Sequence, residues 1–167
     1  MSRFRLITSS WFPRTRSNVF DFFSDAHNLE SLTPPFLRFS VQTPRPIRMG
    51  QGQLIDYSLK LHGFPISWRT EITDWEPPIR FEDSQLRGPY RHWAHTHTFE
   101  EVDGGTLMHD EVIYDVPGGS LSHSLFVKRD LKRIFTYRQE QLPELLGVSR
   151  DSCRIGVVEI QNLRRSR

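Results

Sequence analysis

The sequence predicts an α+β fold in which a curved antiparallel sheet wraps around one long C-terminal helix, with two short helices after the first strand. Two observations lead to this prediction. Between Phe36 and Val116, apolar and polar residues alternate in runs separated by turn residues, as in strands that bury one face. From Leu121 to Leu142, apolar residues recur at helical spacing, which indicates an amphipathic helix. The helix would cover the apolar face of the sheet.

The N-terminal part reads as an extended segment followed by the two short helices. The run FRLITSSW (4–11) is typical of a strand, and Pro13 ends it because proline lacks a backbone donor. In SNVFDFFSDAHNLESL (17–32) the apolar residues stand at helical intervals. Thr33-Pro34-Pro35 ends the second helix, since a residue before proline is pushed out of the helical conformation.

The first long hairpin is predicted from its turn residues. We place the centre of its turn at Gly63-Phe64, which pairs Leu59 with Trp68 and Tyr57 with Thr70. One face of this hairpin is then almost entirely apolar, and the other is polar. The sheet is therefore expected to bury only one side.

The second hairpin, GPYRHWAHTHTFEEVDGGTLMHDEVIYDVPGG (88–119), holds four of the seven histidines. We place the centre of its turn at Gly104-Gly105, which pairs His97 with Val112. A slip of one residue would turn Val112 and Tyr114 toward solvent, so this register is preferred. The predicted neighbours on the covered face are His95, His97, Asp110 and Tyr114, with Asp110 one diagonal step from His97.

A long amphipathic helix follows the hairpin, and the chain then changes character. The predicted apolar stripe consists of Leu121, Leu125, Val127, Leu131, Ile134, Phe135 and Leu142, and Arg138 interrupts it. Pro143 should end or kink the helix. We therefore expect one domain at residues 1–146 and a mobile C-terminal extension at residues 147–167, with one strand-like contact at IGVVEI (155–160).

Composition limits the classes of function. The chain has 167 residues, enough for one domain with a real core, and a net charge of only +2, so nothing indicates a nucleic-acid partner. A short basic tail is expected to be solvated; its residues are Arg154, Arg164, Arg165 and Arg167. Cys153 is the only cysteine, which excludes an intrachain disulfide and a multi-thiolate metal site. We find no apolar run of membrane-spanning length and no signal peptide, so we expect a cytoplasmic protein.

Short motifs along the chain carry a family resemblance. They are Val19-Phe20-Asp21-Phe22-Phe23, Asn28-Leu29-Glu30, Leu32-Thr33-Pro34-Pro35, Gly52 to Tyr57, Trp68-x-Thr70, Trp75-x-Pro77-Pro78, Phe81-x-Asp83-x-Gln85-x-x-Gly88-Pro89-Tyr90, Trp93-x-His95-x-His97-x-Phe99, and Gly105-Thr106 with Asp110 and Tyr114. This pattern, over roughly residues 3–145, resembles the START-like (SRPBCC) superfamily of polyketide cyclases, plant-allergen-type proteins and lipid-transport domains, above all its bacterial ligand-binding, cyclase/dehydrase-like branch. The resemblance implies the helix-grip fold. It does not by itself select a chemistry, because this fold carries transport, binding and catalysis alike.

The histidine strand has three interpretations. His95 and His97 point the same way and, with Asp110, could form a two-histidine, one-carboxylate metal site. Alternatively, one histidine is a general base oriented by Asp110, with Tyr114 donating to a developing oxyanion. In the third, which we favour, the two histidines line a pocket and hydrogen-bond a tyrosine, a carboxylate or a ligand. We therefore predict no bound metal and no cofactor, and the absence of a serine elbow or phosphate-binding glycine loop argues against covalent catalysis.

We predict that the protein binds a small, largely apolar or aromatic ligand between the sheet and the helix. The predicted ligand-contacting residues are Tyr57, Trp68, Thr70, Phe81, Asp83, Gln85, Trp93, His95, His97, Phe99, Asp110, Tyr114 and Arg138. Arg138 could hold a ligand carboxylate or pair with a pocket acid, but we favour a side chain that snorkels at the sheet margin. The alternatives are a cofactor-independent cyclase, dehydratase or hydrolase, and a partner protein with a filled core.

Overall fold

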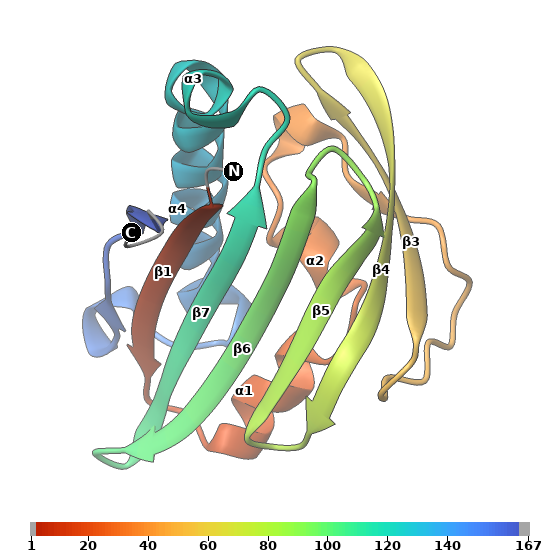
Figure 1. The fold of residues 1–167 in the computed structure, drawn as a ribbon. Coiled ribbons are helices and arrows are strands. Elements are labelled where there is room, and N and C mark those ends of the chain that lie inside the picture. The colour runs from red at the N-terminus through yellow and green to blue at the C-terminus, as the bar shows by residue number, and fades with distance from the viewer. Residues whose placement is uncertain (1–2, 164–167) are drawn as a thin grey trace.

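The computed structural model describes residues 3–163, and within them nine strands form one antiparallel sheet whose helices all lie on one face (Figure 1). The strands are β1 (Arg3–Phe12), β2 (Ser40–Val41), β3 (Leu54–Leu61), β4 (Phe64–Glu76), β5 (Arg80–Arg87), β6 (His92–Val102), β7 (Gly105–Asp115), β8 (Arg154–Ile155) and β9 (Glu159–Leu163). The helices are α1 (Arg16–Phe23), α2 (Asn28–Ser31), α3 (Gly119–Ser122) and α4 (Lys128–Leu145), with 3-10 turns at Pro35–Leu37 and Arg150–Ser152 and a π-helical turn at His123–Val127. The strand order is β2-β3-β4-β5-β6-β7-β1-β8, and β9 also pairs with β1. The predicted α+β architecture is confirmed.

The N-terminal elements lie where the sequence predicts them. β1 ends at Phe12, directly before Pro13, and pairs with β7, so the first strand lies beside the last long one. The side chain of Thr15 caps α1 by accepting a hydrogen bond from the backbone N–H of Asn18 at 3.4 Å. α1 buries its apolar residues against the sheet, where Phe20 packs on Phe99 with ring centroids 5.3 Å apart.

The predicted register of the first hairpin is wrong by two residues. The turn is centred on His62-Gly63, not Gly63-Phe64, so Tyr57 faces Trp68 rather than Thr70. Both central residues have positive φ, 50° and 84°, as a two-residue turn that matches the strand twist requires. Histidine tolerates this conformation better than phenylalanine does. A shift of two residues keeps every side chain on its predicted face, because side chains alternate with a period of two.

The residue pairing of the second hairpin also differs from the prediction by two residues. Its turn is centred on Asp103-Gly104, with φ of 50° and 73°, so His97 faces Asp110 directly instead of diagonally. Gly105 is not a turn residue but a point of close approach, because a Cβ there would lie 2.4 Å from the carbonyl oxygen of Phe12. The inward face of β6 is as predicted: its alternate residues Trp93, His95, His97 and Phe99 are all buried.

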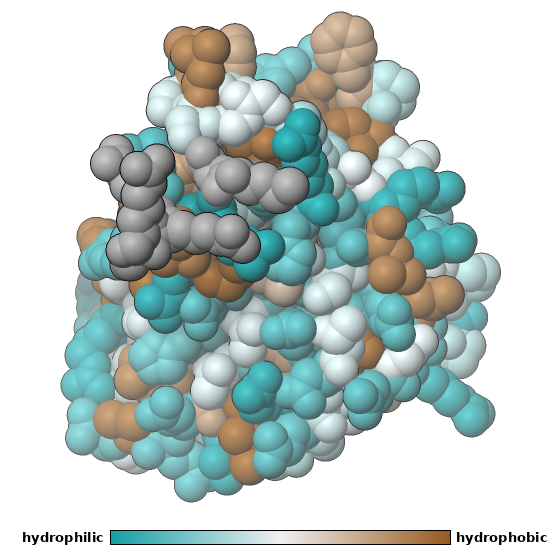
Figure 2. Space-filling view, in the orientation of Figure 1, coloured by the Kyte–Doolittle hydropathy of each residue, from teal (hydrophilic) through white to brown (hydrophobic). Residues whose placement is uncertain are grey.

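The opposite face of the sheet carries mainly polar side chains with scattered apolar ones (Figure 2). Asp56 and Arg69, directly paired across β3 and β4, form two hydrogen bonds of 2.8 Å there. This is the polar alternation that the sequence predicts for a sheet covered on one side only.

The covering layer is a helical segment that runs without interruption from Gly119 to Leu145. Leu131, Phe135 and Leu142 are buried on its inner side, as expected. The first turns differ from the prediction, because Leu121 and Leu125 are 71% and 58% exposed. For Leu121 the reason is its position, because α3 extends past the ends of β1 and β7 (Figure 1).

The end of the helix also differs from the prediction. α4 does not stop at Pro143 but continues to Leu145. Gly147, with φ of 65°, then turns the chain away from the helix axis.

The C-terminal extension forms two strands where we expected one strand-like contact. β8 and β9 pair with the edge of β1 that β7 leaves free. Arg154, which we expected to be solvated, donates to Asp103 at 3.0 Å and lies over the ring of Trp11 at 4.4 Å. The other basic residues of the tail, Arg164, Arg165 and Arg167, lie outside the described residues.

Leu131→Ala should lower the free energy of unfolding by about 2–5 kcal/mol, because it leaves a cavity between α4 and the sheet. Chemical denaturation measures this change. Lys132→Ala, on the exposed side of the same turn, is the control and should change stability by less than about 0.5 kcal/mol. Equal small effects at both positions would mean that α4 is not the element that closes the core.

Candidate functional site

A cavity of about 150 Å³ lies between the sheet and α4, so the space under the helix is not filled by side chains. Its walls come from β3, β4, β5, β6 and α4, and from the segment between α1 and β3. The aromatic residues that line it are Phe23, Phe39, Tyr57, Trp68, Phe81, Tyr90, Trp93 and Phe135. Apolar rings thus form most of the wall.

Nine of the thirteen predicted ligand-contacting residues lie on the cavity wall: Tyr57, Trp68, Thr70, Phe81, Asp83, Trp93, His95, His97 and Arg138. The strand period explains this result. Residues two apart on β3, β4, β5 and β6 share the covered face, and the correct face was predicted despite the register error.

Four predicted residues do not line the cavity. Phe99 belongs to the core beside α1, and Asp110 lies behind the two histidines, on the next strand. The Gln85 amide closes the β5–β6 connection by donating to the carbonyl of Tyr90 at 2.7 Å. Tyr114 packs in the core, where its hydroxyl hydrogen-bonds His123 at 2.9 Å.

Sequence analysis favoured an Arg138 side chain that snorkels at the sheet margin, and this prediction is wrong. Arg138 is buried on the inner side of α4 and lines the cavity.

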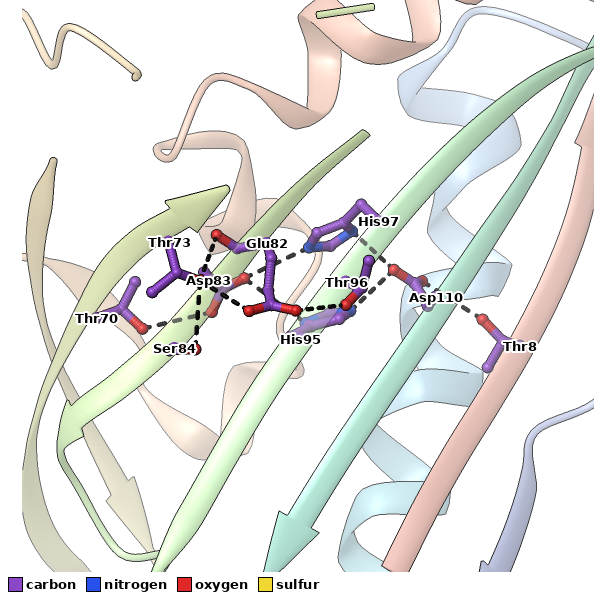
Figure 3. A network of polar contacts seen from close by, with 10 residues as sticks. All are labelled: Thr8, Thr70, Thr73, Glu82, Asp83, Ser84, His95, Thr96, His97 and Asp110. Atoms are coloured by element: carbon purple, nitrogen blue, oxygen red, sulfur yellow. Dashed lines mark hydrogen bonds and ion pairs between the residues drawn. The ribbon is translucent and has the colours of Figure 1, made fainter. Parts of the chain in front are cut away.

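The polar part of the wall is a chain of four side chains on three adjacent strands, which we call the His–Asp cluster: Asp83, His95, His97 and Asp110 (Figure 3). His95 Nε2 donates to Asp110 Oδ1 at 2.9 Å, and His97 Nδ1 lies 2.8 Å from the same oxygen. On the cavity side, Asp83 Oδ2 lies 3.5 Å from His97 Nε2 and 3.9 Å from His95 Nδ1. The two rings therefore stand between two carboxylates.

Hydroxyl groups hold both ends of the cluster. Thr8 of β1 donates to Asp110 Oδ2 at 3.4 Å, and Thr70 of β4 donates to Asp83 Oδ1 at 3.4 Å. Because both hydroxyls come from neighbouring strands, the sheet itself fixes the orientation of each carboxylate.

The surroundings of the two histidines shift their pKa values in opposite directions. Burial lowers the pKa of His97, but the charges of Asp110 and Asp83 and their contacts with the ring outweigh it, so its pKa lies above the ordinary value. Burial and the neighbouring charge of His97 lower the pKa of His95 and outweigh its bond to Asp110. Burial raises the pKa of Asp110, yet His97 and the hydrogen bonds of both histidines hold it well below the ordinary value. Of the two rings, His97 therefore keeps a second proton to higher pH, and His95 loses its second proton at lower pH.

The protonation pattern determines what the cluster can do. When His95 is neutral and its Nε2–H donates to Asp110, its Nδ1 keeps a lone pair. This nitrogen lies on the side of Asp83 and the cavity. That nitrogen can accept a hydrogen bond or a proton from a bound molecule. When His97 is protonated on both nitrogens it has no lone pair to offer, and its raised pKa extends this state to higher pH.

A metal ion would find three candidate ligands here. Asp83, His95 and His97 place one ligand atom each within 4.8 Å of one another. The carboxylate of this set is Asp83 rather than Asp110, which instead holds the far side of both rings. Two features oppose a cation: the raised pKa of His97 favours a proton over a metal ion on that ring, and Arg138 carries a positive charge on the same wall. We therefore keep the prediction that no metal is bound.

Sequence reasoning missed two side chains of this region. Tyr90 lines the cavity and packs on Trp93 with ring centroids 4.6 Å apart. Tyr90 belongs to the motif that runs from Phe81 to Tyr90, but it lies in a loop. The alternation of side chains along a strand therefore does not predict the direction of its ring. His123 lies in the π-helical turn, bonds Tyr114 and stacks on Phe4, and no spacing in the sequence indicates these contacts.

Comparison with known proteins gives one family and one fold. The family described as polyketide cyclase / dehydrase and lipid transport matches residues 12–142. No curated protein matches the chain. No helix among residues 3–163 has the length and apolar character needed to cross a membrane.

Solved structures share the architecture at low sequence identity. A protein from Mycobacterium smegmatis is 19% identical, with a TM-score of 0.63 over 86% of this chain and 90% of that one. Major latex-like protein 151 from Panax ginseng is 10% identical, with a TM-score of 0.61 over 86% and 97%. A nucleoside-diphosphate sugar epimerase from Corynebacterium glutamicum is 28% identical, with a TM-score of 0.59 over 84% of this chain but only 29% of that larger chain. These similarities show the helix-grip fold.

Asp110→Asn should lower the pKa of His97, because it removes the charge that most stabilises the imidazolium. In the wild type, His97 should stay protonated above pH 6.5, and NMR titration of its ring protons measures this. The stability that His97 contributes should be complete below pH 6.5 and disappear as the pH rises through its folded-state pKa. Asp103→Asn makes the same change on an exposed turn residue and should leave His97 unchanged. Equal shifts in the two variants would contradict this assignment.

Elemental analysis of the purified wild type should find metal only at background, and the double variant His95→Gln, His97→Gln should not differ from it. Glutamine keeps hydrogen-bonding capacity at both positions but does not replace an imidazole ligand. Near-stoichiometric metal that disappears in the double variant, or on chelation, would overturn this prediction. It would make Asp83, His95 and His97 the ligands.

Proposed function

The chain belongs to the polyketide cyclase / dehydrase and lipid transport family, and from this premise we propose that it binds a small, largely apolar or aromatic molecule in the cavity under α4. The observation that carries the proposal is the cavity wall itself. Eight aromatic side chains surround one polar patch, the arrangement by which proteins usually bind small organic molecules.

The size and the polarity of the cavity support this class of ligand. An apolar cavity of roughly 150 Å³ is large enough to take up a benzene-sized molecule, and the cavity here has about that volume. Trp68 and Trp93 meet edge to face, with centroids 5.3 Å apart, and offer flat apolar surface to a ring. His95 Nδ1 adds one acceptor that can orient the bound molecule.

The geometry gives less support to the catalytic alternative. A neutral His95 on the wall is a suitable general base, and Asp110 orients it. However, Tyr114, the expected hydroxyl donor, bonds His123 in the core and does not reach the cavity. A cofactor-independent cyclase, dehydratase or hydrolase would need a different donor. We therefore propose ligand binding as the function, in the cytoplasm and without a nucleic-acid partner.

Filling the cavity should abolish binding. Ile134 lines it from α4, so Ile134→Trp places an indole in the space that the ligand would occupy. We expect the wild type to bind benzamide, a neutral aromatic probe, and Ile134→Trp to bind it at least about tenfold more weakly. Isothermal titration calorimetry measures both affinities.

Leu145→Trp is the matched control, since Leu145 lies on the same helix but is exposed and away from the cavity. It should bind the probe like the wild type, and thermal unfolding should show both variants folded. A wild type that does not bind the probe, or equal binding by Ile134→Trp, would refute the proposal.

A further inference from the structure

Arg138 is a buried cation in an otherwise apolar part of the cavity wall. It lies on the inner side of α4 and is only 7% exposed. Its guanidinium carbon lies 4.8 Å from the ring centroid of Phe135, one turn earlier on the helix. The stem and one face of the guanidinium are therefore packed, and the charged group is held in place.

The donors of this guanidinium are not used within the part of the chain that the structure describes. Arg138 Nε and Nη1 are buried, and neither has a hydrogen-bond partner there. A buried charged donor without an acceptor is costly, because the group has lost its hydration and gained nothing in exchange. Such groups occur in native proteins mainly where a further molecule completes them.

The neighbouring carboxylate, Asp83, is already engaged by other groups. His97 Nε2 lies 3.5 Å from its Oδ2, and Thr70 donates to its Oδ1 at 3.4 Å. Arg138 acts on Asp83 only as a nearby charge, the weakest of the influences that lower the pKa of that carboxyl against the effect of burial. The contact with Asp83 also raises the pKa of His97, so this ring interacts with the negative charge of the carboxylate. Asp83 therefore leaves the donors of Arg138 free for another anion.

We propose that the ligand carries a carboxylate, which Arg138 binds, while the apolar body of the molecule lies against Trp68 and Trp93. This inference rests on the proposed function and names the chemical class of the ligand: a small apolar or aromatic carboxylic acid. A guanidinium is the side chain best suited to a carboxylate, because it offers several N–H groups in one plane and stays charged when buried. One cation beside the carboxylates of the His–Asp cluster favours a single negative charge over a phosphate dianion.

A matched pair of probes tests the charge alone. Benzoic acid is ionised at pH 7, and benzamide has the same ring and nearly the same size but is neutral. By isothermal titration calorimetry, the wild type should bind the acid about 10–100-fold more tightly than the amide, the range for a buried charge-assisted hydrogen bond. Arg138→Met should remove this preference by weakening the acid about 10–100-fold, while the affinity for the amide changes by less than about threefold.

Arg129→Met is the control, because Arg129 lies on the exposed side of the same helix. It should keep the full preference for the acid. Arg138→Gln provides a second neutral side chain if the methionine variant does not fold, and it should lose the preference as well. The comparison of the two probes on the wild type needs no variant at all.

The outcomes separate this inference from the proposed function. If the amide binds and the acid binds no better, Arg138 is not a carboxylate site, and the proposed function stands. If Arg138→Met weakens acid and amide equally, the side chain serves packing and the inference fails. If neither probe binds the wild type, both the inference and the proposed function are wrong.

Discussion

The carboxylate of Asp110 is the group on which the polar end of the cavity depends. It is 3% exposed and lies opposite His97 in the pairing of β6 with β7. A buried carboxylate is tolerated only when partners compensate its charge, and here they are two imidazoles and one threonine hydroxyl. The same contacts fix both rings and determine which of them carries the second proton. The chemical character of the cavity wall is thus set by a residue that does not line the cavity.

The cavity and the core share one layer of side chains. α4 closes the sheet through Leu131, Phe135 and Leu142, and two of these residues, Leu131 and Phe135, also line the cavity. The helix therefore cannot fill the space beneath it without removing the pocket. The unfilled volume is a cost in packing.

The charges of the cavity divide into two parts. In the first, His97 stands between Asp83 and Asp110, and the three groups compensate one another through short contacts. In the second, Arg138 stands on the helix side with buried donors that no described residue satisfies. On the sheet side His97 lies within ion-pair distance of two carboxylates, although its Nδ1 does not meet hydrogen-bond geometry, whereas on the helix side Arg138 forms no ion pair with a described residue. This asymmetry distinguishes a group that shapes the cavity from a group available to bind.

The sequence by itself determined which residues face inward, because side chains on a strand alternate with a period of two and those on a helix recur at 3.6. For that reason Tyr57, Trp68, His95 and His97 were placed on the covered face even with both registers wrong by two residues. Only the tertiary structure decided the turn centres, which depend on positive φ at His62 and Asp103. It also decided that Leu121 projects past the sheet, that Arg138 is buried, and that Asp83 completes the His–Asp cluster. These features depend on where the helix crosses the strands and on which strands are neighbours, and a pattern within one element contains neither.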